Sequence, residues 1–258
     1  MKKLLMLIIC SIFFTNSNAG SLKECDSESC KAYFKKFEKG AKGGHGQAIA
    51  MLGEFYYHGY GVAKDSVKAL GYYTKAAKKG ITSAEYKAGL IYLLNEDFKD
   101  LDKGIYFLTK AARAEYKDAL FLLGRIYLTD EFKLKNLNQA DIYLAKAYKK
   151  KHVNMPETLM YIMNTYSSVD EEVFPALHKV VENAPLVLSD NKLHWPVTDT
   201  ETITITSAKI ETIFDIQLKE FRRPIKSVGS RLPGVTCEET VGCITAKNMQ
   251  ELGDMGIL

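Results

Sequence analysis

The nine residues AEYKAGLIY at positions 84–92 have a close copy 36 residues earlier in the chain and another 35 residues later. A second block, beginning Lys-Ala, recurs at the same step at residues 75–77, 110–112 and 146–148. A period of this size is typical of stacked two-helix repeats, which present an extended surface and no catalytic pocket of their own. The sequence therefore predicts an all-α protein, a right-handed α-solenoid of helix-turn-helix repeats with a binding role. The residues that keep the step are Ala48, Ala84 and Ala119; Gly53, Gly89 and Gly124; and Tyr56, Tyr92 and Tyr127.

Each unit reads as a helix, a loop and a second helix. In the first unit, apolar residues of 47–57 share one helical face, and the loop that follows contains Gly59 and Gly61, which accept a positive φ without strain. Asp65 is placed to cap the second helix, 66–79, and Gly80 to end it. The same capping position recurs as Asp100 and Asn136.

At these residues the chain resembles the Sel-one-like repeat family, a relative of the tetratricopeptide repeats. The second and third units lose the Gly-x-Gly-Val loop of the family pattern and keep only its core. The resemblance implies an adaptor or scaffold for other proteins and brings no catalytic residue with it. The first unit matches almost throughout, at Ala48, Leu52-Gly53, Tyr56, Gly59-Tyr60-Gly61-Val62, Asp65, Lys68-Ala69, Tyr72-Tyr73, Lys75-Ala76-Ala77 and Gly80.

The repeats divide the chain into three parts. Residues 1–19 are expected to form a signal peptide, 20–185 the helical repeats and 186–258 a C-terminal extension with short strands. The clear units are 47–82, 83–117 and 118–153, preceded by a capping helix at 31–44. A degenerate fourth unit, 155–184, is predicted from helices at 157–166 and 171–183, with Pro175 early in the second of them.

The first 19 residues have the pattern of a cleavable bacterial secretion signal. Lys2 and Lys3 precede an apolar run that is too short for a stable membrane anchor, and Ser17-Asn18-Ala19 suits a signal peptidase. A lipoprotein signal is disfavoured, because Ile9 stands before Cys10 where a small residue is required. The prediction is a periplasmic or secreted protein with no stable membrane anchor after cleavage.

Charge gives no reason to expect a nucleic-acid partner. Without Lys2 and Lys3, 33 basic and 31 acidic residues remain, a formal charge of +2. So small a net charge does not favour binding to polyanions or to an anionic membrane. The sequence predicts a protein partner and no cofactor.

Four cysteines remain after cleavage: Cys25, Cys30, Cys237 and Cys243. An even number in an exported chain favours two disulfides. Two local pairs are preferred over bridges that join the N-terminus to the C-terminal segment. A zinc site is the least favoured reading, because the spacing is not that of a zinc knuckle and no histidine is near either pair.

The helical phase predicts which residues could face a partner, as three rows of equivalent positions that run across the repeats. Positions three, six and ten after the repeat alanine fall within about 60° of one another, away from the predicted core. Several are large and apolar although solvent-facing positions are usually polar, which favours a docking groove; packing against the next helix is the alternative. The nine residues are Met51, Glu54, His58, Lys87, Leu90, Leu94, Leu122, Arg125 and Thr129.

The C-terminal extension, residues 186–258, differs in composition from the repeats. Residues 198–214 are rich in β-branched side chains and predict one or two strands, or a strand that runs into a helix at 208–221. A short helix is expected at 246–252. The extension is predicted to cap the last apolar face of the solenoid, with a small recognition element as the alternative.

Catalytic patterns are scarce. The five histidines are scattered, and no Gly-x-Ser-x-Gly elbow is present. The chain is predicted not to be an enzyme but a periplasmic adaptor or inhibitor. As a small disulfide-bearing repeat protein with a signal peptide it resembles known immunity partners of secreted phospholipase effectors. This resemblance implies, as the specific hypothesis, an immunity protein that neutralises a secreted, type VI-type, phospholipase-like effector. The alternatives are a periplasmic regulator and an envelope or motor assembly scaffold. A cell-wall or β-lactam-acting enzyme is less favoured, because the relatives connected with that activity carry a cysteine pair in every repeat and this chain does not.

Overall fold

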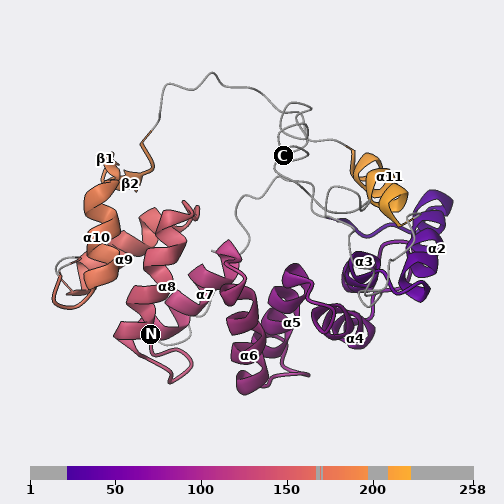
Figure 1. Cartoon of the computed structure of the whole chain (residues 1–258), viewed down its shortest axis with the longest axis horizontal. Helices are drawn as coiled ribbons and strands as arrows, with labels where there is room; N and C mark the ends of the chain where they lie inside the picture. Colours follow the sequence, from indigo (N-terminus) through magenta and orange to yellow (C-terminus); the bar gives the residue numbers. More distant parts are fainter. Residues whose placement is uncertain (1–21, 167–168, 170, 197–208, 222–258) are drawn as a thin grey trace, which may run out of the picture. The chain divides into compact units, whose positions relative to one another are not determined.

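The computed structural model describes residues 22–166, 169, 171–196 and 209–221. The chain divides into two compact units, Met1–Arg222 and Arg223–Leu258, and all described residues belong to the first. Within them the chain is mostly helical, with one small sheet (Figure 1). The elements are α2 (Glu28–Lys42), α3 (Gly46–His58), α4 (Ser66–Ala77), α5 (Thr82–Leu94), α6 (Leu101–Arg113), α7 (Lys117–Leu128), α8 (Leu137–Lys149), α9 (Met155–Tyr166), α10 (Pro175–Asn183), β1 (Val187–Ser189), β2 (Lys192–His194) and α11 (Ile210–Glu220).

The helices of the repeats pack in the order of the sequence. α3 packs on α4, α5 on α6 and α7 on α8, and successive pairs meet through α4 with α5 and α6 with α7. Each repeat therefore contacts its neighbours along the chain, which is how a solenoid builds its core. The predicted α-solenoid fold is confirmed.

The recurring glycine lets the two helices of each repeat approach closely. A Cβ atom at these positions would collide with a side chain of the second helix, so no other residue fits without a shift. The added Cβ would lie 2.7 Å from the Tyr73 ring at Gly53, 2.8 Å from Leu108 at Gly89 and 2.6 Å from Leu144 at Gly124.

The predicted helix caps are also confirmed. The side chain before each second helix accepts the backbone N–H of the residue three positions later and so satisfies a donor that has no partner within the helix. The bonds are Lys68 N–H to Asp65 (2.9 Å), Lys103 N–H to Asp100 (3.0 Å) and Gln139 N–H to Asn136 (3.1 Å).

A disulfide between Cys25 and Cys30 closes a short segment at the start of α2, as the local pairing predicts. This segment lies on the loop of the first repeat: Cys25 N–H donates to the Gly59 carbonyl at 3.1 Å, and Gly61 N–H donates to the Cys25 carbonyl at 2.6 Å. Gly61 has a φ of +67°, and a Cβ there would overlap the Cys30 carbonyl oxygen. The glycine loop that only the first repeat retains thus makes room for the disulfide segment.

The fourth helix pair begins at different residues from those predicted. α9 starts at Met155, two residues before the predicted Glu157, and α10 starts at Pro175 instead of residue 171. Proline suits the first position of a helix, because its φ is already helical and the missing N–H would have no partner there. The expected helical start at 171 is therefore wrong, and the proline marks the true beginning.

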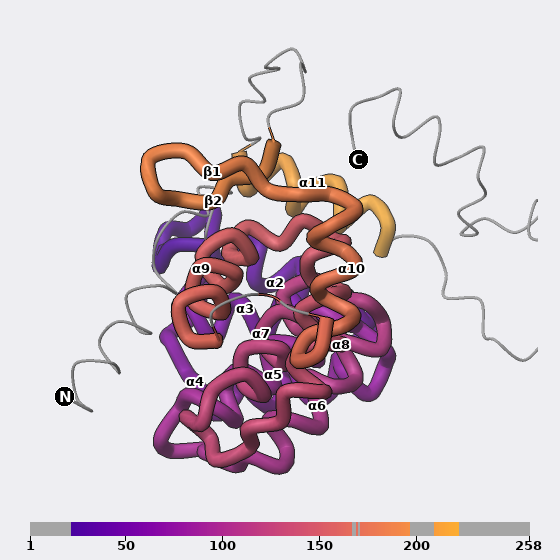
Figure 2. Tube along the Cα trace, turned by 90° about the vertical axis from the view of Figure 1, so that its left-hand side faces the viewer, coloured from indigo at the N-terminus to yellow at the C-terminus, as the bar shows by residue number. Residues whose placement is uncertain are grey.

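A strand pair follows α10, upstream of the segment in which strands were expected. β1 and β2 are antiparallel, with Leu188 opposite Leu193. The turn between them uses Asp190 and Asn191 at positive φ, which is typical of a two-residue hairpin. β2 contacts α9 (Figure 2). The centre of the Trp195 ring lies 4.8 Å from that of Tyr148 on α8. This segment covers the last helices of the array.

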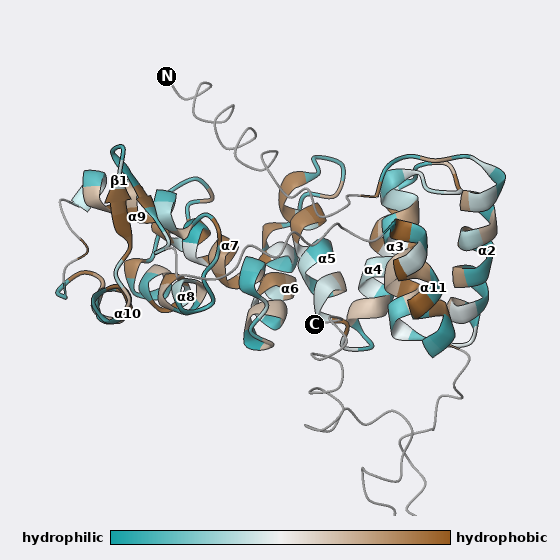
Figure 3. Cartoon of the chain, turned by 90° about the horizontal axis from the view of Figure 1, so that it is seen from above, coloured by the Kyte–Doolittle hydropathy of each residue, from teal (hydrophilic) through white to brown (hydrophobic). Residues whose placement is uncertain are grey.

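Helix α11 packs on α2, at the first helices and not at the last ones. It lies within the predicted alternative helix at 208–221, so the strand interpretation is wrong for Ile210–Phe214. Figure 3 shows hydrophobic residues in both α3 and α11. The cap predicted for the last apolar face is thus made by the strand pair and Trp195, while α11 covers the opposite, aromatic face. Phe214 is fully buried, with ring centroids at 5.3–5.5 Å from those of Tyr33, Phe37, Phe55 and Tyr60.

Some predictions concern residues outside the described part of the chain: the signal peptide at 1–19, strands at 198–208, the Cys237–Cys243 pair and the helix at 246–252. Of the helices that are described, none is both long and apolar enough to cross a membrane.

Candidate functional site

The nine predicted partner-facing residues lie on α3, α5 and α7 and on the residue that ends α7. None is buried: Leu94 is 54% exposed and the other eight are half-buried. The structure brings five of them together in one groove, and two of these five also line a neighbouring hollow with Lys87. Met51 lines neither and packs against the core of the first repeats.

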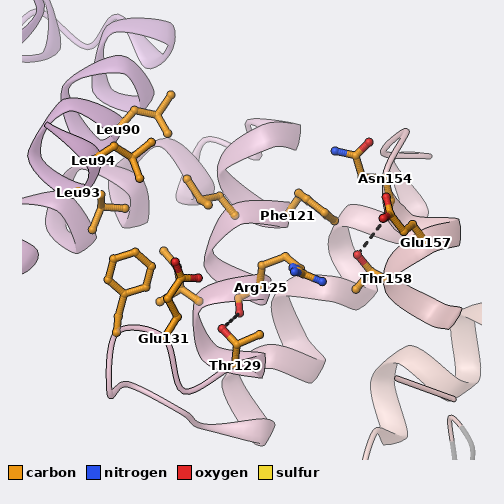
Figure 4. A pocket seen from close by; sticks show the side chains of 13 residues that line it. Leu90, Leu93, Leu94, Phe121, Arg125, Thr129, Glu131, Asn154, Glu157 and Thr158 are labelled. Carbon is orange, nitrogen blue, oxygen red and sulfur yellow. Dashed lines mark hydrogen bonds between the residues drawn. The ribbon is translucent and has the colours of Figure 1, made fainter. Parts of the chain in front are cut away.

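The groove lies between α5, α7 and α9 and has a volume of about 780 Å³, including space open to solvent (Figure 4). We call it the α5–α9 groove. Its apolar walls are Leu90, Leu93 and Leu94 from α5, Phe121, Leu122 and Ile126 from α7, and Phe132 from the loop after α7. Its polar lining is Arg125, Thr129, Glu131, Asn154, Glu157 and Thr158.

The wall formed by α9 is not among the predicted positions. Its repeat signal was available: a further step of 36 residues from Leu122 and Arg125 leads to Thr158 and Tyr161. Thr158 lines the groove, and Tyr161 contacts Arg125. Phe132 carries no such signal, because the loop after α7 does not match the loop of the first repeat.

Arg125 is the cation in the lining of the groove. Its guanidinium carbon lies 5.4 Å from the centre of the Tyr161 ring, a cation–π contact. In Figure 4 the guanidinium points from α7 toward Thr158 on α9. Thr129 donates its hydroxyl to the Arg125 carbonyl at 3.1 Å and so satisfies the end of α7. Throughout the described ranges, no carboxylate forms a salt bridge with Arg125.

The neighbouring hollow is lined by residues of α3, α4 and α5 and has a volume of about 610 Å³, including space open to solvent. Beside it, Glu54 forms an ion pair with Lys87 of the next repeat at 3.6 Å, and its second carboxylate oxygen lies 3.4 Å from the Nε2 of His58. Burial acts to raise the pKa of Glu54, but the hydrogen bond from His58 and the charge of Lys87 outweigh it and lower the pKa. Burial, together with the charge of Glu54, raises the pKa of Tyr73. The charges at this junction of repeats are therefore matched within the chain.

A buried histidine supports the wall of the α5–α9 groove. His152 is 5% exposed and stacks on Phe121 with ring centroids 3.9 Å apart. Its Nε2 lies 3.4 Å from Asp118, and its Nδ1 accepts the N–H of Asn154 at 3.2 Å. The hydrogen bond from His152 lowers the pKa of Asp118, against the effect of burial. This cluster holds Phe121 and Asn154, which both line the groove.

The groove combines an apolar contact surface with a few hydrogen-bonding groups. An open groove with apolar walls and a few polar groups suits an apolar side chain of a partner, with the polar groups setting its orientation. In the part of the chain that the structure covers, no three metal-ligating side chains gather into a site.

The comparisons with known proteins agree with this fold. The Sel1 repeat family matches residues 46–81, 82–116 and 117–152, which contain the three helix pairs from α3 to α8. No curated protein matches the sequence.

Two solved structures share the fold. A protective antigen of uropathogenic Escherichia coli strains that displays an SLR fold is 21% identical, with a TM-score of 0.50 over 60% of this chain and 34% of that chain. A Sel1 repeat protein from Oxalobacter formigenes is 23% identical, with a TM-score of 0.50 over 60% of this chain and 64% of that chain. The chain thus spans less than two-thirds of the length of either protein.

An immunity protein from Pseudomonas aeruginosa is 16% identical, with a TM-score of 0.31 over 66% of this chain and 87% of that chain, too low a similarity to support an argument. The family match, and the fold shared with the other two proteins, remain. Sel1 repeats generally mediate protein–protein interaction. Residues 46–152 therefore form an array of three Sel1 repeats within this chain.

Proposed function

We propose that this chain is an exported, non-enzymatic adaptor or inhibitor that holds one protein partner in the α5–α9 groove. The observation that carries the proposal is the groove itself, whose walls are apolar and open and include Leu94 at 54% exposure. Apolar pockets of this kind, framed by polar groups, are where binding energy concentrates in protein interfaces. The repeats are of a family that generally mediates such interactions.

The proposed binding surface continues from the groove along α5 and α3. It includes Lys87, Glu54, His58 and Met51, in the rows that the helical phase predicts. The Glu54–Lys87 ion pair lies on this continuation and joins two repeats. Because its charges are already paired, we expect it to orient the partner more than to attract it.

Two features support export. Cys25 and Cys30 form a disulfide, and structural disulfides persist in oxidising compartments. The first 19 residues have the pattern of a cleavable signal. Mass spectrometry of the protein from a periplasmic fraction should find a chain that begins at Gly20 with the disulfide intact. A chain that keeps its first residues and stays in the cytoplasm would reject the export part of the proposal.

Within this class, neutralisation of a secreted toxic effector is the specific role we favour. An exported protein with an open apolar groove is suited to covering the active surface of one toxin. Co-expression with the product of a neighbouring effector gene should protect cells that are otherwise killed. If a sensor-kinase or envelope gene lies beside it instead, and no protection is seen, the regulatory or scaffold role takes its place.

The groove is tested by affinity capture with three forms of the protein. Wild type and Ile142→Gln, which changes a 44% exposed side chain on α8 away from the groove, should retain the same partner. Leu94→Gln should lose it while helicity and melting temperature stay close to wild type, because Leu94 is exposed and contributes little to the core. Equal capture by all three forms would place the binding surface elsewhere.

A further inference from the structure

Among the described residues, a charge is paired where the first repeat meets the second, but not where the third repeat meets the fourth helix pair. Glu54 in the first repeat corresponds in position to Arg125 in the third. Glu54 pairs with Lys87 of the following repeat at 3.6 Å. By the same spacing, the residue of the following unit that corresponds to Lys87 is Thr158 on α9. An uncharged residue therefore stands where a carboxylate would be needed to pair with Arg125.

The groups around Arg125 do not replace that carboxylate. Thr158 donates its hydroxyl to the Asn154 carbonyl at 3.0 Å, and Tyr161 offers the face of its ring. Glu131 and Glu157 line the same groove but are exposed and form no ion pair with it. Glu157 stands in the first turn of α9, where the helix dipole stabilises a carboxylate in its own right.

We propose that the α5–α9 groove recognises a segment of its protein partner in which a large apolar side chain lies next to one carboxylate. The apolar side chain enters among Leu90, Leu94 and Leu122, and the carboxylate binds Arg125. A half-buried arginine over an aromatic ring is well placed for this, since its planar group can donate two parallel hydrogen bonds to a carboxylate. This inference rests on the proposed function and names the chemistry of the partner.

The exposed glutamates limit that chemistry further. Glu131 and Glu157 repel a run of acidic residues at the edges of the groove, because like charges oppose binding there. The segment therefore carries a single carboxylate and not an acidic cluster. That carboxylate comes either from an Asp or Glu side chain or from the C-terminus of the partner, and both present the same group to Arg125.

The experiment selects random short peptides on the full chain, in one library with a free C-terminus and in one with a blocked C-terminus. We expect enriched peptides to contain one acidic group beside Leu, Ile, Met or Phe. Enrichment from the free-end library alone would assign the carboxylate to the chain terminus, and enrichment from both would assign it to a side chain. Enrichment of basic or purely apolar peptides would overturn the inference.

Individual peptides are then measured against variants. Arg125→Gln should weaken binding about tenfold or more. Asp→Asn or Glu→Gln in the peptide should weaken binding to wild type by the same factor. The altered peptide should bind Arg125→Gln no more weakly than the original peptide does, because the interaction is already lost. Arg113→Gln, which removes an exposed cation at the end of α6, is the matched control and should bind as wild type. Equal binding to Arg125→Gln and wild type would overturn the role of the carboxylate.

The same peptides separate this inference from the proposed function. Peptides that require Leu94 but bind Arg125→Gln as well as wild type would overturn only the carboxylate. Peptides that bind Leu94→Gln as well as wild type, or the recovery of none, would count against the groove and so against both. Circular dichroism of each variant should match that of wild type. Arg125→Gln keeps the hydrogen bond at the end of α7, because the Thr129 hydroxyl donates to the backbone carbonyl of residue 125 and not to its side chain.

Discussion

The carboxylate of Asp141 on α8 accepts the backbone N–H of Leu177 at 2.7 Å and caps α10 from a different helix. Its second oxygen accepts the N–H of Ala176 at 2.9 Å. The residue before α10 is Phe174, whose side chain cannot cap. A helix that begins with Pro175 thus receives from α8 the acceptors that its own sequence does not supply.

Removal of this cap should destabilise the fourth helix pair. Asp141→Ala leaves the buried N–H of Leu177 and the half-buried N–H of Ala176 without this acceptor and should lower the free energy of unfolding by about 2–3 kcal/mol. Urea denaturation measures the loss, and hydrogen exchange should become faster in α10 before α3–α6. Asp102→Ala, an exposed carboxylate in the first turn of α6, serves as the control. Unchanged exchange in α10 would contradict the capping role.

Two glycine substitutions should have opposite effects. Gly53→Ala places a Cβ 2.7 Å from the buried Tyr73 ring and should cost about 1–3 kcal/mol by overpacking. Gly71 lies inside α4 with nothing within 4 Å of an added Cβ. Gly71→Ala should therefore stabilise the protein by up to about 1 kcal/mol through helix propensity. Thermal unfolding of both variants would settle the comparison, and two equal shifts would argue against close helix contact at Gly53.

Phe214 should control whether α11 stays on α2. Truncation of a fully buried phenylalanine costs about 3–5 kcal/mol. The other side chains of α11 are not fully buried, so we expect their contacts to be too weak to hold the helix in place without Phe214. Phe214→Ala should abolish the exchange protection of α11 and leave that of α5–α9 unchanged. Ile213→Ala, at a 41% exposed position of the same helix, should leave α11 protected. Loss of protection throughout the repeats would mean that α11 is part of a single cooperative unit.

Asp118 should contribute an acid-sensitive part of the stability. Its pKa is lowered in the folded state, chiefly by the hydrogen bond from His152. The stabilisation is therefore complete above the unfolded pKa of about 3.9 and is lost as the pH falls through the folded value. Because the side chain is 43% exposed, we expect less than about 1 kcal/mol.

The measurement is the free energy of unfolding of wild type and Asp118→Asn as the pH falls from neutral to about 3. The two curves should converge at the acid end, where the carboxylate of the wild type is protonated. Glu131→Gln, an exposed carboxylate in the loop after α7, is the control and should run parallel to wild type. A constant gap between Asp118→Asn and wild type at all pH values would exclude a titrating contribution.

The candidate groove was partly accessible to prediction. Leu90, Leu94, Leu122, Arg125 and Thr129 follow from the helical phase, because one repeat period carries each row from helix to helix. Phe132 and the His152 cluster do not follow from any row. They reach the groove through a loop and through the start of α9, and their positions depend on how those backbones turn.

The sequence by itself determined the solenoid, because its contacts join residues about one repeat apart and leave a period that can be read directly. Gly53 and its equivalents show this, because a side chain of the next helix fills the space that a Cβ would occupy at each of them. Only the tertiary structure decided which segments cover the two ends of the helical array. Phe214 lies among the aromatic rings of α2 and α3, and Tyr33 donates to Asp215, 182 residues away in the sequence. Two apolar faces so far apart carry no common period, so their match appears only when both are folded.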